Sequence, residues 1–237
     1  IEIQGSNLNN PSTITTRSGL ASGGGASADI ALYADRDLLI RDGAILSTTS
    51  NGNDVAPGRI NLEAGRNLEV SGGSELRAEA QRPLGGTSPP APPLDTPGNG
   101  LAIDRGDISL HAGSVLSLED AQISTFTRRA VSGNIEVTAE RAIESFSTTI
   151  LTEVDRNDGT GGDITITAPI VLLSDSSFSA DANGASADAG NLLISASSAL
   201  LVDATTELTA DPGQLGVAGE IILSTPETNL FSTLVVV

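Results

Sequence analysis

Apolar and polar residues alternate along this chain in short, similar segments. Residues 161–173 read GGDITITAPIVLL, and related phrases are GDISLHAGSVLSL, GNIEVTAERAI and GNLLISASSALLV. Strict alternation places every second side chain on the same face of a β-strand. Each phrase holds a small residue, a polar residue and then three apolar positions spaced by two. The pattern therefore predicts half-buried strands and no helices.

The phrase returns at a nearly constant interval. The intervals are 27 to 30 residues, with one exception of 48. A fixed period near 28 indicates a solenoid, in which a repeat is stable only when neighbouring repeats cover its apolar side chains. The sequence thus predicts a single domain over residues 1–237, built from about seven coils of about 28 residues. The coils are expected to begin near Ala28, Gly58, Gly106, Gly133, Gly162, Gly190 and Gly219.

Three apolar columns follow when the repeats are aligned. The first expected strand of a coil has apolar residues at three alternate positions, as in Ile164, Ile166 and Ala168. A second strand is expected about ten residues after the start of each coil, with pairs such as Leu38/Ile40. Three short strands per coil, separated by turn residues, describe a single-stranded parallel β-helix, an all-β fold. A third strand is expected to begin near Ile45, Leu76, Ile123, Ile150, Phe178 and Leu208.

Composition narrows the function classes. The chain has 12 Arg, no Lys and 30 acidic residues, for a formal charge of −18, so it repels the phosphates of nucleic acids and anionic lipids. The absence of Cys excludes disulfides, thiol catalysis and Cys-ligated metals. No apolar run approaches the roughly 20 residues of a membrane-spanning helix, so membrane insertion is not expected. The chain does not begin with Met, which indicates a processed or excised piece.

The repeats resemble a known family of bacterial proteins. The segments GGDITITAPIVLLSDSSFSADANG, AGNLLISASSALLVDATTEL and GVAGEIILSTPETNLFSTLVVV are similar to repeats of filamentous haemagglutinin-like exoproteins of two-partner secretion, particularly the large multi-repeat adhesins of cyanobacteria. The resemblance covers roughly residues 28–237. It implies a right-handed β-helix, export across the outer membrane of a Gram-negative-type bacterium, and a role at the cell surface or outside the cell. A right-handed path also agrees with the usual hand of parallel crossovers.

Two loop features have both a functional and a structural interpretation. The Pro- and Gly-rich residues 81–100 form an insertion in the second coil, either a projection that contacts a partner or a tolerated surface loop. Loops that precede the coil starts are rich in Asp, Asn and Gly, which suits turns and also suits a structural Ca²⁺ ion. The candidate metal ligands are Asp155, Asp158, Asp163, Asp181 and Asp188.

A carbohydrate-active enzyme, similar to β-helical polysaccharide lyases or hydrolases, is the alternative function. Such enzymes need acids and a base grouped on one outward face. His111 is expected to face outward as an ordinary strand residue, and we assign no catalytic and no cofactor-binding residues. The outward charged residues that could form such a group are Asp35, Arg36, Asp37 and Arg41 on the first coil, and Asp104, Arg105 and Asp107 near the third.

We therefore expect an extracellular structural or adhesive solenoid, part of a surface stalk or filament. Neither IEIQG at the start nor LFSTLVVV at the end resembles a cap. Uncapped strand edges favour pairing with other strands. Expected partners are another copy that associates end to end, or the continuation of a longer stalk, together with a host or matrix glycan or protein.

Overall fold

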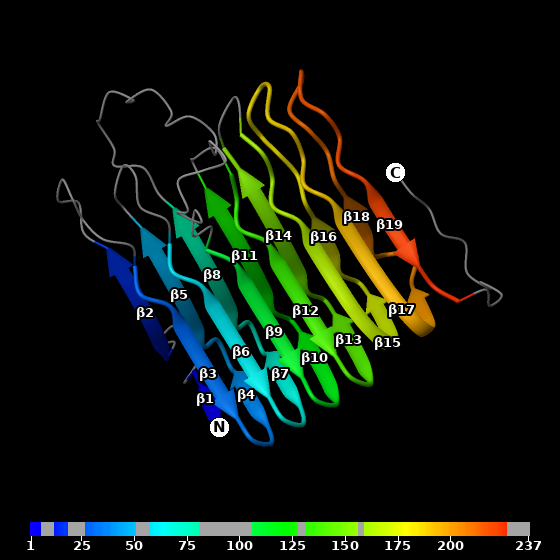
Figure 1. Ribbon diagram of the computed structural model, residues 1–237. Coiled ribbons are helices and arrows are strands. Elements are labelled where there is room, and N and C mark those ends of the chain that lie inside the picture. Colours follow the sequence, from blue (N-terminus) through cyan, green and yellow to red (C-terminus); the bar gives the residue numbers. More distant parts are fainter. Residues whose placement is uncertain are drawn as a thin grey trace, which may run out of the picture.

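The chain folds as a parallel β-solenoid. The computed structural model describes residues 1–5, 12–18, 27–50, 57–80, 106–127, 131–155 and 159–226. Throughout these residues the regular structure consists of β-strands, and each pairing between strands is parallel. The strands stack in about six turns, and corresponding strands of successive turns lie side by side (Figure 1). The predicted all-β parallel solenoid is confirmed.

The first strands of the coils form one continuous ladder. Its register follows the repeat, since Ile164 pairs with Ile135 on one side and with Leu192 on the other. The members are β3 (Ile30–Ala34), β6 (Ile60–Ala64), β9 (Ile108–Ala112), β12 (Ile135–Ala139), the first half of β15 (Ile164–Ser174), the first half of β17 (Leu192–Val202) and β19 (Ile221–Ser224).

The second and third strands of the coils form two further ladders. The second contains β1 (Glu2–Gln4), β4 (Leu38–Arg41), β7 (Leu68–Ser71), β10 (Val115–Glu119), β13 (Ala142–Phe146) and the second halves of β15 and β17. The third contains β2 (Thr13–Ser18), β5 (Ile45–Ser50), β8 (Glu75–Ala80), β11 (Gln122–Thr127), β14 (Thr149–Val154), β16 (Ser177–Ser179) and β18 (Glu207–Thr209).

The core lies inside the coils and is almost wholly aliphatic. Ile164, Ile166 and Val171 are each 0% exposed, as the alternation predicts. Among the described core residues, the one large aromatic side chain is Phe178, which stacks in the third ladder. Each buried Ile or Leu contributes roughly 1.5–3 kcal/mol relative to an exposed side chain, before conformational entropy is subtracted. The stacked aliphatic rows therefore supply most of the stability of the described coils.

The third strand of the first coil begins at Ile45, as expected, and its core residue is Leu46, which pairs with Leu76, while half-buried Ile45 pairs with Glu75. Two other details differ from the sequence prediction. The first and second strands run together in β15 and β17, which pair with a register irregularity between Ala168 and Ile170. The N-terminal residues, which precede the first predicted coil start, already form β1 and β2.

A threonine column closes the corner between a third strand and the next coil. In β2, β5, β11 and β14, the inward Thr donates a hydrogen bond to the carbonyl oxygen at the start of the following coil, whereas β8 has Ala78 at this position of the column. The bonds are Thr16 to Ala28 (2.6 Å), Thr48 to Gly58 (2.7 Å), Thr125 to Gly133 (2.8 Å) and Thr152 to Gly162 (2.6 Å). This hydrogen bond joins the end of a third strand to the start of the next coil, whatever the length and sequence of the loop between them.

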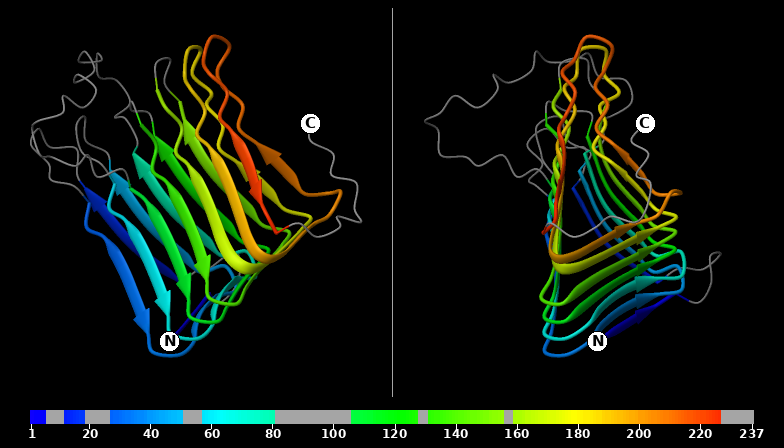
Figure 2. Two further views of the ribbon diagram at one scale, coloured as in Figure 1. Left: turned by 45° about the vertical axis from the view of Figure 1, so that its right-hand side comes forward. Right: turned by 90° about the vertical axis from the view of Figure 1, so that its right-hand side faces the viewer.

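Glycine at the coil start is required by close backbone packing. A Cβ atom on Gly162 would lie 1.9 Å from the carbonyl oxygen of Gly133, and one on Gly190 would lie 1.9 Å from that of Gly162. Gly106 has a different reason, since its φ of 69° is in the left-handed region. Residues 180–190 and 210–219, which precede two of the coil starts, project together along one edge of the solenoid (Figure 2). Among the described residues, no helix could cross a membrane.

Candidate functional site

The polar residue before each first strand belongs to a hydrogen-bonded ladder. The side-chain oxygen of one coil accepts a bond from the backbone N–H of the equivalent residue in the next coil. The successive bonds are Asn134 N–H to Asp107 (2.8 Å), Asp163 N–H to Asn134 (2.9 Å), Asn191 N–H to Asp163 (2.7 Å) and Glu220 N–H to Asn191 (3.0 Å). These groups are occupied in holding neighbouring coils together.

The spacing of this ladder bears on calcium binding. Its acids alternate with Asn, so two carboxylates of the row lie two coils apart, or about 9.6 Å at the strand spacing of about 4.8 Å. A Ca²⁺ ion needs oxygens at about 2.3–2.6 Å, and therefore cannot join two of these carboxylates. Asp163 consequently has no second acid within its own row to complete a metal site.

The other calcium candidates are dispersed over the loop corner. Asp181 accepts bonds from the backbone N–H of Asp211 (2.7 Å) and from the hydroxyls of Ser179 and Thr209. Asp188 accepts from the backbone N–H of Val217 at 2.8 Å. Asp155 is exposed, and Asp158 lies outside the described residues, as do residues 81–100. Within the described ranges, no three His, Asp or Glu side chains gather closely enough to hold a metal.

Asp also has a local role at the corner between the second and third strands. Asp42, Asp120 and Asp175 occupy the left-handed region there, with φ of 57°, 50° and 49°. Asp203 lies at the same corner of the next coil and accepts a hydrogen bond of 2.5 Å from the Ser174 hydroxyl. This bond, together with others from Thr206, Thr205 and the Asp175 backbone, holds the pKa of Asp203 well below its usual range, although burial acts in the opposite direction. This acid-rich corner is therefore explained by turn geometry.

The charged residues of the first coils are mostly paired across the ladder. Arg66 donates two hydrogen bonds to Asp37, and Asn67 donates a third at 3.1 Å. The Arg66 bond is the main reason that the pKa of Asp37 lies below its usual value. Arg41 contacts Glu69 at 2.5 Å, a bond that raises the pKa of Arg41. Of the residues considered for an enzyme site, Asp37 and Arg41 are thus engaged in pairs that join coils.

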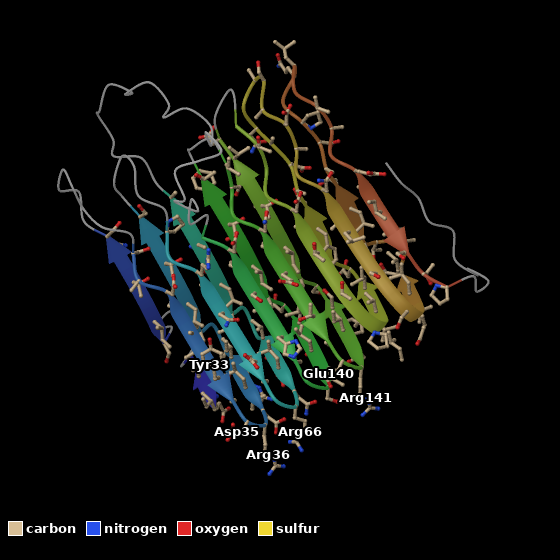
Figure 3. The ribbon with its side chains drawn as sticks, viewed as in Figure 1. Tyr33, Asp35, Arg36, Arg66, Glu140 and Arg141 are labelled. Atoms are coloured by element: carbon tan, nitrogen blue, oxygen red, sulfur yellow. The ribbon has the colours of Figure 1, made fainter. Side chains whose placement is uncertain are left out.

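The other described residues considered for an enzyme site lie at two separate places. Asp107 belongs to the polar ladder and lies 3.9 Å from Arg59 in a second contact. Asp104 and Arg105 lie outside the described residues. Asp35 and Arg36 are exposed at the corner after β3, with Arg66 beside them and Glu140 and Arg141 farther along the same edge (Figure 3).

His111 faces outward, as expected, and is half-buried. Its ladder neighbours are Glu63 and Thr138, so a carboxylate, an imidazole and a hydroxyl lie in one row. The Thr138 hydroxyl is 2.9 Å from His111 Nδ1 and donates to the Leu110 carbonyl at 3.3 Å. Whether Nδ1 donates to this hydroxyl or accepts from it depends on the tautomer of His111. Activation of the hydroxyl as a nucleophile would require Nδ1 to accept its proton.

An aromatic side chain and polar groups come together on the outward side of the first ladder. We name this surface the Tyr33 face, formed by Tyr33, Asp35, Arg36, Asn61, Glu63 and Arg66. Tyr33 is 59% exposed and pairs in the ladder with exposed Glu63. The Asn61 amide donates to the Tyr33 hydroxyl at 3.1 Å. This face is the candidate binding site, since it offers an accessible ring with planar polar groups around it.

The sequence did not identify this face. Tyr33 and Glu63 are 30 residues apart, and their contact follows from the ladder register. The signal that could have found it is the single Tyr of the chain at an outward position of a strand.

Fold and site together define a parallel β-solenoid with a polar surface. Comparison with known proteins finds no matching family model, no matching curated protein and no matching solved structure. The functional conclusion therefore depends on the physical features described above and on the repeat resemblance.

Proposed function

We propose that this chain is part of an extracellular structural and adhesive solenoid, a stalk or filament at the outer surface of a Gram-negative-type bacterium. The observation that carries the proposal is the continuous in-register stacking of the first strands, from Ile30 through Ile164 to Ile221. Such a ladder can extend without limit by adding coils, which suits a rod that spans distance. The resemblance to filamentous haemagglutinin-like exoproteins supports the same function.

The finer description belongs to the same proposal. We infer a right-handed helix of about seven coils of about 28 residues with three short strands per coil. The starting positions near 28, 58, 106, 133, 162, 190 and 219 support the coil count. The rule that parallel crossovers are right-handed supports the hand. In this description β15 and β17 each represent two strands joined at a corner.

The outward surface favours attachment over catalysis. Two of the charged residues considered for an enzyme site are held in ion pairs, Asp37 with Arg66 and Arg41 with Glu69. Polysaccharide lyases and hydrolases need a base and an acid directed at one substrate position. An enzyme of that kind is the alternative function, and we favour the non-enzymatic one because these paired charged side chains serve to join neighbouring coils.

The axial ends support association along the rod. In the described residues, the outermost strands are β1, β2 and β3 on one side and β18 and β19 on the other. Inward residues of these strands, such as Leu32, Leu208 and Leu223, are only partly buried. Partly covered apolar rows with free strand edges favour a further coil on top. The proposal assigns this position to the continuation of a longer stalk or to another copy that stacks end to end.

Electron microscopy of the purified chain, with light scattering over a concentration series, tests the structural part. We expect rods whose length increases with concentration for end-to-end association, or short rods of constant length for a stalk segment. Compact round particles would contradict the proposal. Binding of the labelled chain to bacterial or host-cell surfaces tests adhesion, and absence of binding to both would contradict it.

Incubation with polysaccharides tests the enzymatic alternative. New unsaturated or reducing ends after incubation with polygalacturonate or alginate would show a polysaccharide-degrading enzyme. The proposed function predicts no increase above a heat-denatured control. Turnover that survives repurification and is lost in a variant of the outward face would replace the adhesive function with the enzymatic one.

A further inference from the structure

We propose that the Tyr33 face binds a neutral polysaccharide chain. The inference rests on the adhesive function proposed above and names the chemical class of the ligand and its site. It is carried by one exposed aromatic ring, by the exposed polar groups around it, and by the charge of the molecule. Each of these observations is independent of the repeat resemblance.

The ring supplies the stacking surface. Tyr33 is 59% exposed on β3, whose neighbour in the first ladder is β6. A hydrogen bond of 3.1 Å from the Asn61 side-chain amide holds the Tyr33 hydroxyl, so the ring is positioned before a ligand arrives. The C–H face of a pyranose packs on an aromatic ring, which removes apolar surface of both from water. A preset ring loses little conformational entropy on binding.

The surrounding groups supply hydrogen bonds. Glu63, Asp35 and Arg36 are exposed, and the charge of Arg36 also contributes to lowering the pKa of nearby Asp37. Carboxylate and guanidinium groups are planar and offer two adjacent acceptors or donors, which match neighbouring hydroxyls on a sugar ring. The side chains of Tyr33, Asp35, Arg36 and Arg66 lie near the same corner of the solenoid (Figure 3). Stacking and hydrogen bonding are therefore available within one patch.

Charge selects a neutral ligand over an acidic one. On this face Arg66 is paired with Asp37, so the two carboxylates of Asp35 and Glu63 exceed the one remaining cation, Arg36. The face thus has no excess of positive charge to attract uronates or sulfates. The whole chain carries a formal charge of −18, which repels polyanions at low ionic strength. A hexose polymer without charged groups avoids both penalties.

The expected affinity is low and suits attachment by many sites. A single ring with a few exposed hydrogen bonds is compatible with a dissociation constant of about 1 mM. Molecules arrayed along a surface or a filament bind a long polysaccharide with much greater avidity than one site does. A polysaccharide is for this reason a better ligand than a short oligosaccharide.

Affinity electrophoresis of the whole chain in native gels tests the proposal. The gels contain glucomannan, hydroxyethyl cellulose, dextran, or polygalacturonate as the acidic comparison. We expect retardation by at least one neutral polymer and none by polygalacturonate. Y33A should reduce the retardation at least tenfold, whereas Y33F keeps the ring and should retain most of it. The matched control is F146A, which removes an aromatic ring that is 47% exposed on the second ladder and should leave binding unchanged.

The outcomes separate this inference from the proposed function. Retardation by none of the neutral polymers, retardation by polygalacturonate alone, or equal retardation of Y33A and the parent would overturn the polysaccharide site. If the chain still adheres to cells in those cases, adhesion stands and uses another surface. If Y33A alone loses both polysaccharide retardation and cell binding, with unchanged circular dichroism and melting temperature, both proposals are supported.

Discussion

A charge placed in the inner row of the first ladder tests the architecture most directly. Ile164 is 0% exposed and stacks between Ile135 and Leu192, which are also buried. The substitution I164D exchanges an aliphatic side chain at this point for a carboxyl group. No water reaches the position, and the aliphatic neighbours provide no hydrogen-bond partner.

Two contributions set the magnitude. Loss of the buried isoleucine costs roughly 1.5–3 kcal/mol. A buried aspartate avoids its charge by remaining protonated, which costs about 1.4 kcal/mol for each pH unit above its ordinary pKa of about 3.9, or about 4 kcal/mol at pH 7. The loss of unfolding free energy is therefore about 6–7 kcal/mol at pH 7. Domains are commonly stable by about 5–15 kcal/mol, so the coils around Ile164 should unfold or become marginal.

The same reasoning fixes the pH dependence. Burial raises the pKa of the introduced carboxyl group in the folded state, so the folded state keeps its proton while the unfolded state releases it above about pH 3.9. The unfolded state then binds fewer protons, and the stability of I164D falls as pH rises. Relative to the parent, the variant should recover about 4 kcal/mol between pH 7 and pH 4.

Urea unfolding monitored by circular dichroism at both pH values measures these effects. I164A is the control for lost volume, and its difference from the parent should be the same at pH 4 and pH 7. T167D places the same charge on the exposed face of the same strand and should change stability by less than about 0.5 kcal/mol. If I164D unfolds like the parent, or if T167D is the more damaging of the two aspartates, the inward assignment of the column is wrong.

Four further outcomes are expected from the corners of the solenoid. The depressed pKa of Asp203 contributes stability that is present above its unfolded pKa of about 3.9 and is lost as pH falls below that value, so D203N should make thermal melting less sensitive to acid than in the parent. T152V should lower the unfolding free energy by about 1–3 kcal/mol, because the buried Gly162 carbonyl loses its donor, while T152S and the exposed T149V should be close to the parent in urea unfolding. G162A should destabilise by about 1–3 kcal/mol or more, since its Cβ meets backbone; an unchanged urea midpoint would refute the close packing of this corner. Addition of EDTA or of millimolar Ca²⁺ should leave the melting temperature unchanged if the corner acids serve as hydrogen-bond acceptors, and a rise with Ca²⁺ would support the calcium interpretation.

The inward-facing rows of side chains could be predicted from the sequence because the alternation that produces them lies within each single strand. Alternation at Ile164, Ile166 and Ala168 assigns a face to each side chain without knowledge of the neighbours. The period near 28 then predicts which rows stack, and the register of the first ladder confirms it. The coil-start glycines were also evident in the sequence, but their main cause, the close approach to the backbone of the preceding coil, is a feature of the tertiary structure.

Functions of polar residues could not be read in the same way. Asp163 suggests a metal ligand or a turn residue in isolation, and the structure shows a side-chain acceptor for the backbone of Asn191. The sequence around Thr152 does not indicate that its hydroxyl donates a hydrogen bond to the Gly162 carbonyl oxygen at the start of the next coil. Polar side chains have several partners of similar energy, so only the geometry of the neighbouring coil selects one.

By itself, the sequence determined the β-strand class, the parallel solenoid and the inward rows, because burial of apolar side chains at a fixed period depends on residue type and spacing alone. Only the tertiary structure decided that Leu46 and not Ile45 enters the core, that strands join in β15 and β17, and that Tyr33 lies beside Glu63. These features depend on the exact register between coils that are about 30 residues apart. A shift of one residue moves a side chain to the opposite face, and the cross-coil contacts that fix this register have no counterpart within a single repeat.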